Sequence, residues 1–505
     1  MNTKTRQAAR LGWLMAATAA AALMAGCGGG SSNDSAPSPA PAPAPVPAPA
    51  PAPTPAPAPV ATDRIEPYDT GDTVPKRAAL AVRALGSGDM VARVALGPVA
   101  EGVLPTQAAT QMTKASQIGV ARDVPALASA SDLSALLRWT TTPRGTRVAA
   151  LSVTSQGAKG VRLGLVVRSL PGDAVLRFYA QAGAAVTEVT GAEVMATIER
   201  NLQAGAVGDV ARTYWSPDFD GPETTVEVEI PAASPTGSVV LALPRLSHYV
   251  VSPDDVSVPG MAKVGESGSC EVDVLCHPDS LSQSRSVARM TFVSEGKSYL
   301  CTGTLLNDAR SSGTPYLLSA HHCISRQVEA SSLISDWFYR ASACDSGVLG
   351  SGRQRLSGGA TLLHATSATD TSFMRLNDAP PAGVVYAGSY FGTMETGHSM
   401  VGVHHPRGDL QKVSAGIMVQ FSTCADEVCS RSDQAQGTFL TMGWNLGVTE
   451  GGSSGSGLFQ TIGAKRYLVG QLYGGASSCQ APAGQDQYGR FDVAYRNALK
   501  QWLNP

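Results

Sequence analysis

The residues most able to do chemistry in this sequence are a serine, a histidine and an aspartate that lie far apart along the chain. Ser454 lies in the glycine-rich stretch Gly447–Gly457, where glycines let the backbone turn sharply and point two N–H groups at one place. His322 belongs to the run Ser319–Cys323, and Asp370 lies between the two. A serine hydroxyl becomes a strong nucleophile when an imidazole accepts its proton and a carboxylate orients that imidazole. These three residue types predict nucleophilic catalysis by Ser454.

Taken alone, the glycine-rich stretch also fits a flexible surface loop, because Gly and Ser are common in such loops. The histidine and the aspartate favour the catalytic interpretation. A protein that only binds a partner has no need of all three groups together.

The length and the composition limit the class of protein. A chain of 505 residues is too long for one core, so we expect two or more domains. With 53 glycines and 6% aromatic and 15% charged residues, the chain is typical of a turn-rich, β-rich protein. A formal net charge of -2 gives no reason to expect a nucleic-acid partner. Nine cysteines indicate an oxidising compartment.

The first residues are typical of an export signal. Basic residues precede the apolar run Leu11–Ala25, which is too short to span a bilayer comfortably. The run ends in Leu23–Cys27, which resembles the bacterial lipobox. We therefore expect residues 1–26 to be a lipoprotein signal peptide and Cys27 to carry a lipid, with ordinary secretion as the alternative. This places the protein at the bacterial cell envelope, on the outer membrane, from which the catalytic domain could be released.

Residues 27–60 are expected to form a spacer. Proline alternates mainly with alanine from Ala36 to Val60, a composition that favours extended polyproline conformation. At roughly 3 Å per residue, this stretch reaches about 75 Å. It would hold a folded body away from the membrane.

Residues 61–263 are expected to form a separate, mostly β domain of sandwich-like architecture. Thr225–Ile230 alternates apolar and acidic residues, which predicts a strand with one wet face. Thr190 and Glu193 have capping-box spacing at the start of a helix that ends before Gly205. The region has no cysteine and a single histidine, His248, so we expect no metal site here. Further strands are predicted at Arg147–Val153, Arg162–Val167, Ala174–Tyr179 and Val239–Leu243.

Residues 264–505 hold the remaining eight cysteines and all three candidate catalytic residues. Strands are predicted at Tyr299–Leu306, Tyr316–Ser319 and Tyr467–Tyr473, and the C-terminal residues carry one apolar helical stripe from Tyr495 to Leu503. Spacing alone does not fix how the cysteines pair.

Several motifs of this part resemble one family. Cys301–Leu306, Ser319–Cys323 and Gly452–Gly457 are similar to the three landmarks of chymotrypsin-like serine proteases. More narrowly, the chain from about Gly265 to Pro505 resembles the bacterial lysyl endopeptidases, and the sequence before it is similar to their long propeptide. The motifs that carry this likeness are Gly268–Cys270, His404–Pro406, Gly447–Gly457, Gln471–Gly475, Ser477–Cys479 and Asp486–Arg490. The resemblance implies an all-β catalytic domain, a chymotrypsin-like double β-barrel.

The resemblance also implies roles for individual residues. His322, directly before the cysteine, would be the general base, and His321 a neighbour without a role in proton transfer. Asp370 would be the triad aspartate, in preference to Asp345 and Asp378, which are less well placed. The backbone N–H groups of Gly452 and Ser454 would form the oxyanion hole.

The disulfide pairing is likewise implied by the family. It would join Cys270 to Cys479, Cys276 to Cys344 and Cys301 to Cys323. Cys424 and Cys429 have no family counterpart, and either a local bridge between them or two thiols in an insertion is open.

The substrate pocket is expected to recognise lysine. Val448, six residues before the nucleophile, carries no charge, so the family pattern assigns recognition of the substrate cation to Asp486, with a solvated loop aspartate as the alternative. A compact ammonium suits a single recessed carboxylate better than a planar guanidinium does. Tyr473 and Gly474 are further expected specificity residues, and Tyr473 stands where family members carry histidine, which opens the possibility of cleavage after Arg as well.

Together these features predict a secreted or surface-anchored serine endopeptidase that cleaves polypeptides after Lys. The alternatives are a serine protease of other or broader specificity and a catalytically silent surface binding protein. Cleavage after Lys263 would separate the two domains and make the chain a zymogen. We expect a monomer that needs no metal or other cofactor.

Overall fold

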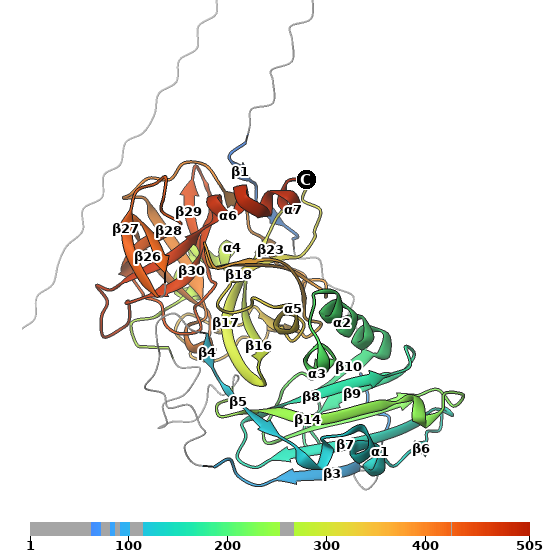
Figure 1. Ribbon diagram of the computed structural model, residues 1–505. Helices are drawn as coiled ribbons and strands as arrows, with labels where there is room; N and C mark the ends of the chain where they lie inside the picture. The colour runs from blue at the N-terminus through green and yellow to red at the C-terminus, as the bar shows by residue number, and fades with distance from the viewer. Residues whose placement is uncertain (1–61, 72–80, 86–90, 101–114, 253–266, 426) are drawn as a thin grey trace, which may run out of the picture. The chain divides into compact units, whose positions relative to one another are not determined.

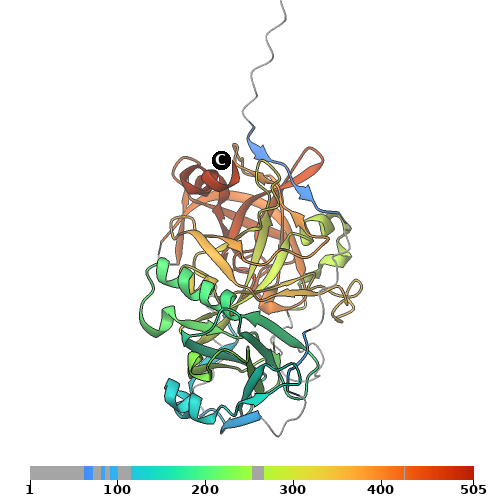
Figure 2. The same ribbon diagram turned by 90° about the vertical axis from the view of Figure 1, so that its right-hand side faces the viewer.

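The computed structural model describes residues 62–71, 81–85, 91–100, 115–252, 267–425 and 427–505 (Figures 1 and 2). The predicted signal peptide, Cys27, the proline-rich spacer and Lys263 lie outside these residues. Residues from Ala61 to Pro505 belong to one compact unit. No helix among the described residues combines the length and the apolar character needed to cross a membrane.

Two sheets form the N-terminal region, defined here as residues 91–252. The first has the order β10-β9-β13-β7-β3, and β6 pairs with β7. The second has the order β11-β8-β14-β5, and β12 pairs with β8. Their strands are β3 (Val91–Leu96), β5 (Gly119–Asp123), β6 (Thr140–Thr141), β7 (Arg147–Ser155), β8 (Gly160–Ser169), β9 (Val175–Tyr179), β10 (Val186–Thr190), β11 (Thr213–Trp215), β12 (Phe219–Asp220), β13 (Glu223–Ile230) and β14 (Val240–Tyr249).

One hydrophobic core fills the space between these sheets. Leu151 of β7, Leu165 of β8 and Phe178 of β9 are all fully buried in it. The predicted helix is α2 (Gly191–Gln203), capped by Thr190 with the expected capping box. Short helices α1 (Ala130–Leu136) and α3 (Gly208–Ala211) complete the region. The sandwich-like prediction is confirmed.

The predicted wet face of β13 is wrong. Glu227 and Glu229 are buried, because Arg177 of the neighbouring strand lies 3.0 Å from one carboxylate and 2.6 Å from the other. Glu227 also accepts hydrogen bonds from the backbone N–H groups of Ala84 and Leu85. Buried charges persist where they are paired and hydrogen-bonded, so an alternating acidic pattern can belong to a strand that is buried on both faces.

The C-terminal region, defined as residues 267–505, is built on two larger sheets. The first has the order β20-β19-β16-β17-β18-β22-β21. Its strands are β16 (Val287–Ser294), β17 (Lys297–Leu306), β18 (Tyr316–Ala320), β19 (Ile334–Trp337), β20 (Gln354–Leu356), β21 (Ala360–Thr366) and β22 (Thr371–Leu376). The short helices α4 (Leu281–Ser284) and α5 (Gln327–Ala330) lie in the connections before β16 and before β19.

The second sheet closes into a barrel, because β30 pairs with both β29 and β31. The barrel order is β30-β29-β25-β26-β28-β31, and β15, β24 and β27 pair at its margins. These strands are β15 (Val272–Asp273), β24 (Ser389–Tyr390), β25 (Ser399–His404), β26 (Lys412–Ala425), β27 (Val428–Ser432), β28 (Phe439–Leu446), β29 (Gly457–Ile462), β30 (Lys465–Gly475) and β31 (Gln485–Arg490). The all-β fold predicted from the sequence is confirmed.

The C-terminal helix is present but is not regular. It runs through α6 (Phe491–Ala494), a π-helical turn (Tyr495–Leu499) and α7 (Lys500–Leu503). Tyr495, Leu499 and Leu503 are buried on its inner side, as the predicted stripe requires.

Three short strands from the first 117 residues pair with strands of the C-terminal region. β1 (Arg64–Ile65) pairs with β24, and β2 (Tyr68–Asp69) pairs with β23 (Val385–Tyr386). β4 (Ser116–Gln117) pairs with β17 (Figure 1). Backbone pairing therefore links residues 64–69 and residues 116–117 to the C-terminal region.

Candidate active site

The loop that carries Ser454 connects β28 to β29 and is held against β17. The N–H of Thr302 in β17 donates to the Ser454 carbonyl at 2.8 Å, and its hydroxyl donates to the Gly452 carbonyl at 2.9 Å. Gly452 and Gly455 have φ angles of 96° and 80°, in the left-handed region that favours glycine. A side chain at Gly455 would also collide with Ser319. The glycines are thus needed to seat the serine, which is buried.

Strand pairing brings His322 and Asp370 together. His322 follows the end of β18, Asp370 precedes β22, and Ala320 pairs with Thr371 where these antiparallel strands meet. The His322 Nδ1 lies 2.8 Å from Asp370 Oδ2, and the His322 N–H donates to Asp370 Oδ1 at 3.0 Å. The carboxylate therefore fixes the ring so that Nδ1 faces it and Nε2 faces the other way.

The groups expected to act on a substrate have no hydrogen-bond partner among the described residues. His322 Nε2 is buried and has no hydrogen-bond partner among the described residues. Within the same residues, no backbone hydrogen bond uses the N–H of Gly452 or Ser454. No hydrogen bond joins Ser454 to His322 here, and catalytic contacts are often loose without a substrate. A proton acceptor and two free donors thus accompany the serine.

The aspartates considered as alternatives to Asp370 have other partners or positions. Asp378 accepts a hydrogen bond from the N–H of Gly358 at 2.7 Å. Asp345 follows the disulfide cysteine Cys344 in an exposed turn. His321 donates its backbone N–H to the Asp370 carbonyl at 3.0 Å.

Four disulfides brace this region. They are Cys270–Cys479, Cys276–Cys344 and Cys301–Cys323, the pairings that the family resemblance implies, and Cys424–Cys429, the local bridge that was one of two alternatives. Cys301 lies in β17 and Cys323 directly follows His322, so this bridge ties the candidate base to the strand that holds the serine loop.

Asp486 lies at the buried inner end of β31. Its carboxylate is fully buried and accepts hydrogen bonds from Trp444 Nε1 at 2.6 Å and from Thr449 Oγ1 at 2.7 Å. Ser477 donates to it through both its N–H and its hydroxyl, at 3.1 and 2.5 Å. Among the described residues, no Lys, Arg or His forms an ion pair with it. The solvated-loop alternative for Asp486 is therefore excluded by its burial.

Tyr473 and Gly474 lie on β30, the strand that pairs with the strand of Asp486. Gly474 pairs with Gln487, the neighbour of Asp486 in β31. The Tyr473 ring meets His322 edge-on, with centroids 6.0 Å apart, and lies 5.2 Å from Phe439. Tyr473 therefore lies between the candidate base and Phe439 of β28.

Several supporting residues around the nucleophile loop could not be predicted from the sequence. His404 bridges Ser453 and Ser414, with both of its ring nitrogens 2.8 Å from a hydroxyl. Burial lowers the pKa of His404 to about 3, so the ring is neutral at ordinary pH. Glu450 accepts hydrogen bonds from the Gly268 N–H at 2.8 Å and from Arg407 at 3.0 Å. The pair His404-His405 was the only sequence signal for any of these contacts.

The fold and the site define a serine-type endopeptidase of the chymotrypsin-like class. Residues 264–489 match the family described as lysyl endopeptidase, C-terminal domain, and residues 95–250 match the lysyl endopeptidase N-terminal domain. The lysyl endopeptidase of Pseudomonas aeruginosa is 35% identical over 376 residues, which cover 71% of this chain and 76% of that protein. The chain therefore belongs to the lysyl endopeptidase family.

Solved structures show only distant likeness. A thermostable serine protease from an extremophilic microorganism is 13% identical, with a TM-score of 0.31 over 44% of this chain and 100% of that one. An HtrA-type protease in complex with a tripeptide is 15% identical, with a TM-score of 0.30 over 44% of this chain and 62% of its own.

Proposed function

We propose that this protein is an exported endopeptidase that cleaves polypeptides after lysine through Ser454, His322 and Asp370. The observation that carries the specificity is Asp486, a fully buried carboxylate for which the described residues supply hydrogen bonds but no cation. A buried charge without a counter-ion is costly, and a substrate ammonium would compensate it.

The proposed catalytic step uses these groups in turn. Ser454 Oγ attacks the carbonyl carbon of the substrate while His322 Nε2 accepts its proton, and Asp370 stabilises the resulting imidazolium. The N–H groups of Gly452 and Ser454 hold the developing oxyanion, at roughly 3 kcal/mol per donor. His322 then returns the proton to the leaving amine, and water hydrolyses the acyl-enzyme by the same route.

Lysine is favoured over arginine by the arrangement around Asp486. Three of its four hydrogen bonds converge on Oδ2, from Trp444, Thr449 and Ser477. This leaves no second free oxygen for the paired bonds that a planar guanidinium makes with a carboxylate. A lysine ammonium can be bound by the negative charge of this carboxylate without such paired hydrogen bonds. The name of the Pseudomonas aeruginosa relative agrees with this preference.

The proposal includes the cellular setting inferred from the sequence. Lipidation of Cys27 would anchor the chain to the outer membrane, and cleavage after Lys263 would free the C-terminal region as a monomeric enzyme. The support for these steps is the lipobox-like sequence, the spacer and the lysine that separates the two family matches.

The proposed activity is tested with peptides that differ only at the residue before the scissile bond. The wild type should cleave the Lys peptide, cleave the Arg peptide at least tenfold more slowly, and barely cleave the norleucine peptide. It should also react with a serine phosphonylating reagent, whereas Ser454→Ala should do neither. Equal rates for Lys and Arg would support the broader-specificity alternative. A wild type that does not react with the reagent would support the binding-protein alternative.

A further inference from the structure

His404, the last residue of β25, is a fully buried histidine that contacts the loop of Ser454. Its Nδ1 lies 2.8 Å from the hydroxyl of Ser453, and its Nε2 lies 2.8 Å from the hydroxyl of Ser414 in β26. The catalytic step proposed above does not use this ring. A buried imidazole with a partner on each nitrogen nevertheless fixes the two polar groups relative to each other.

The partners of the two hydroxyls decide where the protons lie. The Ser414 hydroxyl donates its proton to the Val448 carbonyl, so it accepts from the ring, and His404 Nε2 carries the hydrogen. A neutral imidazole then has its lone pair on Nδ1, so the Ser453 hydroxyl donates to it. The Glu450 N–H donates to Ser453 Oγ at 3.3 Å. The four hydrogen bonds thus form one chain in which every donor meets an acceptor.

Both ends of this hydrogen-bond chain lie in the loop of Ser454. One end is the Glu450 N–H and the other is the Val448 carbonyl. Thr449, which lies between these two residues, donates to Asp486, the candidate lysine-binding carboxylate, at 2.7 Å. The middle of the chain is carried by β25 and β26, which are neighbouring strands of the barrel. The part of the loop beside Asp486 is therefore fixed to the barrel through His404.

Ser453 also lies between the two candidate oxyanion donors. It separates Gly452 from Ser454, and the peptide unit that begins at the Ser453 carbonyl carries the N–H of Ser454. The Ser456 N–H donates to the Ser453 carbonyl at 3.0 Å, while His404 holds the Ser453 side chain. Oxyanion donors are effective when their direction is fixed before the reaction. Loss of the contact with His404 would let Ser453 rotate and would redirect the N–H groups on both sides of it.

We propose that His404 is a positioning residue for the cleavage reaction, and that its Nε2–H tautomer aligns the oxyanion hole and the lysine pocket together. The inference rests on the proposed function and deepens it. His404 acts through Ser453 on the two oxyanion donors, and through Ser414 on the residues beside Asp486. It takes no part in proton transfer to or from the substrate.

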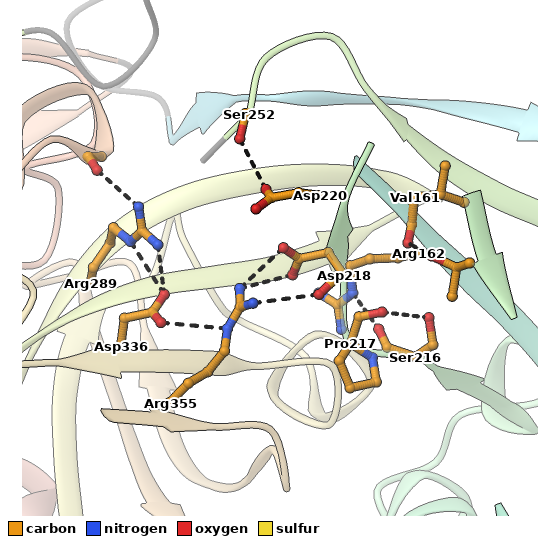
Figure 3. Close-up of polar contacts among 12 residues, drawn as sticks. Val161, Arg162, Ser216, Pro217, Asp218, Asp220, Ser252, Arg289, Asp336 and Arg355 are labelled. Carbon is orange, nitrogen blue, oxygen red and sulfur yellow. Dashed lines mark hydrogen bonds and ion pairs between the residues drawn. The ribbon is translucent and has the colours of Figure 1, made fainter. Parts of the chain in front are cut away.

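The loop of Ser454 has a further support that does not run through His404. The Arg407 N–H donates to the Gly451 carbonyl at 2.6 Å, and Arg289 donates to the carbonyl of the residue after Arg407 at 3.2 Å. Arg289 is itself paired with the buried Asp336 at 2.8 Å (Figure 3). The loop should therefore stay folded against the barrel when His404 is replaced, while its donors lose their alignment.

The main test compares His404→Leu with His404→Gln. Leucine has no polar atom and breaks the hydrogen-bond chain at both nitrogens. Glutamine offers an N–H donor to Ser414 and a carbonyl acceptor to Ser453, in the same sense as the ring. For a Lys peptide, kcat per active site should fall roughly 100-fold or more in His404→Leu, the loss that follows removal of one oxyanion donor. In His404→Gln it should stay within about tenfold of the wild type.

Counting active sites separates positioning from folding. Exhaustive titration with the serine phosphonylating reagent counts the molecules that have a competent Ser454, and kcat is divided by this number. A histidine needed only for folding would lower the count and leave kcat per site within threefold of the wild type, which would overturn the inference. Equal losses in His404→Leu and His404→Gln would also overturn it, because the pattern of donor and acceptor would then not matter.

A matched control changes the neighbouring buried histidine. The Nδ1 of His405 lies 3.0 Å from the Asp409 carbonyl, and its ring makes no hydrogen bond to the loop of Ser454 among the described residues. His405→Gln should therefore keep kcat per site within threefold of the wild type. A loss as large as that of His404→Leu would show that any change to this buried pair has the same effect, and would contradict the assignment.

A double-mutant cycle tests whether Ser414 and His404 act through one chain. Ser414→Ala breaks the chain at the Val448 end and should lower kcat per site. Adding Ser414→Ala to His404→Leu should cause no further loss, because both changes break the same connection. Losses that multiply would refute the chain. If the wild type neither cleaves Lys peptides nor reacts with the phosphonylating reagent, the proposed function itself is wrong and this inference falls with it.

Discussion

Replacing Asp486 by asparagine tests the basis of lysine recognition most directly. The substitution keeps the shape of the side chain and removes a buried charge that forms no ion pair with a cation of the described residues. Removing one member of a buried ion pair costs about 3–5 kcal/mol. At about 1.4 kcal/mol per tenfold change, kcat/KM for a Lys peptide should fall roughly 150- to 4,000-fold.

The assay compares a Lys peptide with a norleucine peptide of the same sequence. Norleucine fills a similar volume without the charge, so the ratio of the two kcat/KM values cancels any general loss of catalytic power. In Asp486→Asn this ratio should collapse toward one. Titration with the phosphonylating reagent counts the active sites that remain folded.

A control variant shows whether a general disturbance around Asp486 could produce the same result. Thr449→Val removes one hydrogen-bond donor from Asp486 and keeps the charge, so it should weaken binding while it preserves the preference for Lys. A Lys-to-norleucine ratio in Asp486→Asn within threefold of the wild-type ratio would refute the assignment of Asp486 to lysine recognition.

Three further outcomes follow from other buried groups. Burial lowers the pKa values of His404 and His405 to about 3, so both stay neutral in the folded chain while the unfolded chain takes up protons below about pH 6.5. The free energy of unfolding should therefore fall by several kcal/mol from about pH 6.5 toward pH 3, and an unchanged urea midpoint between pH 7 and pH 4 would contradict this. Arg177→Ala strands two buried glutamates and should destabilise the chain by about 3–5 kcal/mol, measured by urea unfolding at pH 7. Asp370→Asn should lower kcat for the Lys peptide by about 10⁴ with little change in melting temperature, and a loss below tenfold would exclude Asp370 from the triad.

The sequence was a good guide wherever a short motif carries its own geometry. The glycines on both sides of Ser454 and the His-Cys pair at His322 indicated two of the candidate catalytic residues. Both signals are local, because the first reflects the backbone conformation of one loop and the second a cysteine next to the histidine. The strand and helix predictions held for the same reason, since periodicity and capping depend on neighbouring residues.

It was a poor guide to contacts between distant segments. The pattern around Glu227 indicated a wet face, and contacts from distant parts of the chain, among them Arg177 on the adjacent strand and the N–H of Ala84, bury that face. The hydrogen-bond donors to Asp486 are Trp444, Thr449 and Ser477, and no sequence motif predicts that they meet at this carboxylate. The pairing of β4 involves two residues, too few for any periodic signal.

The hydrogen bonds that hold the loop of Ser454 limit the ways in which the N-terminal region could inhibit the enzyme. In the uncleaved chain, Gly268 already donates to Glu450, His404 already bridges to Ser453, and Thr302 already holds the Ser454 carbonyl. Because these contacts are already made, the loop does not need the new N-terminus that cleavage after Lys263 would create in order to become ordered. The inhibition that the proposed zymogen arrangement calls for would then act on access to the nucleophile loop, and β4 follows the edge of β17 toward that loop.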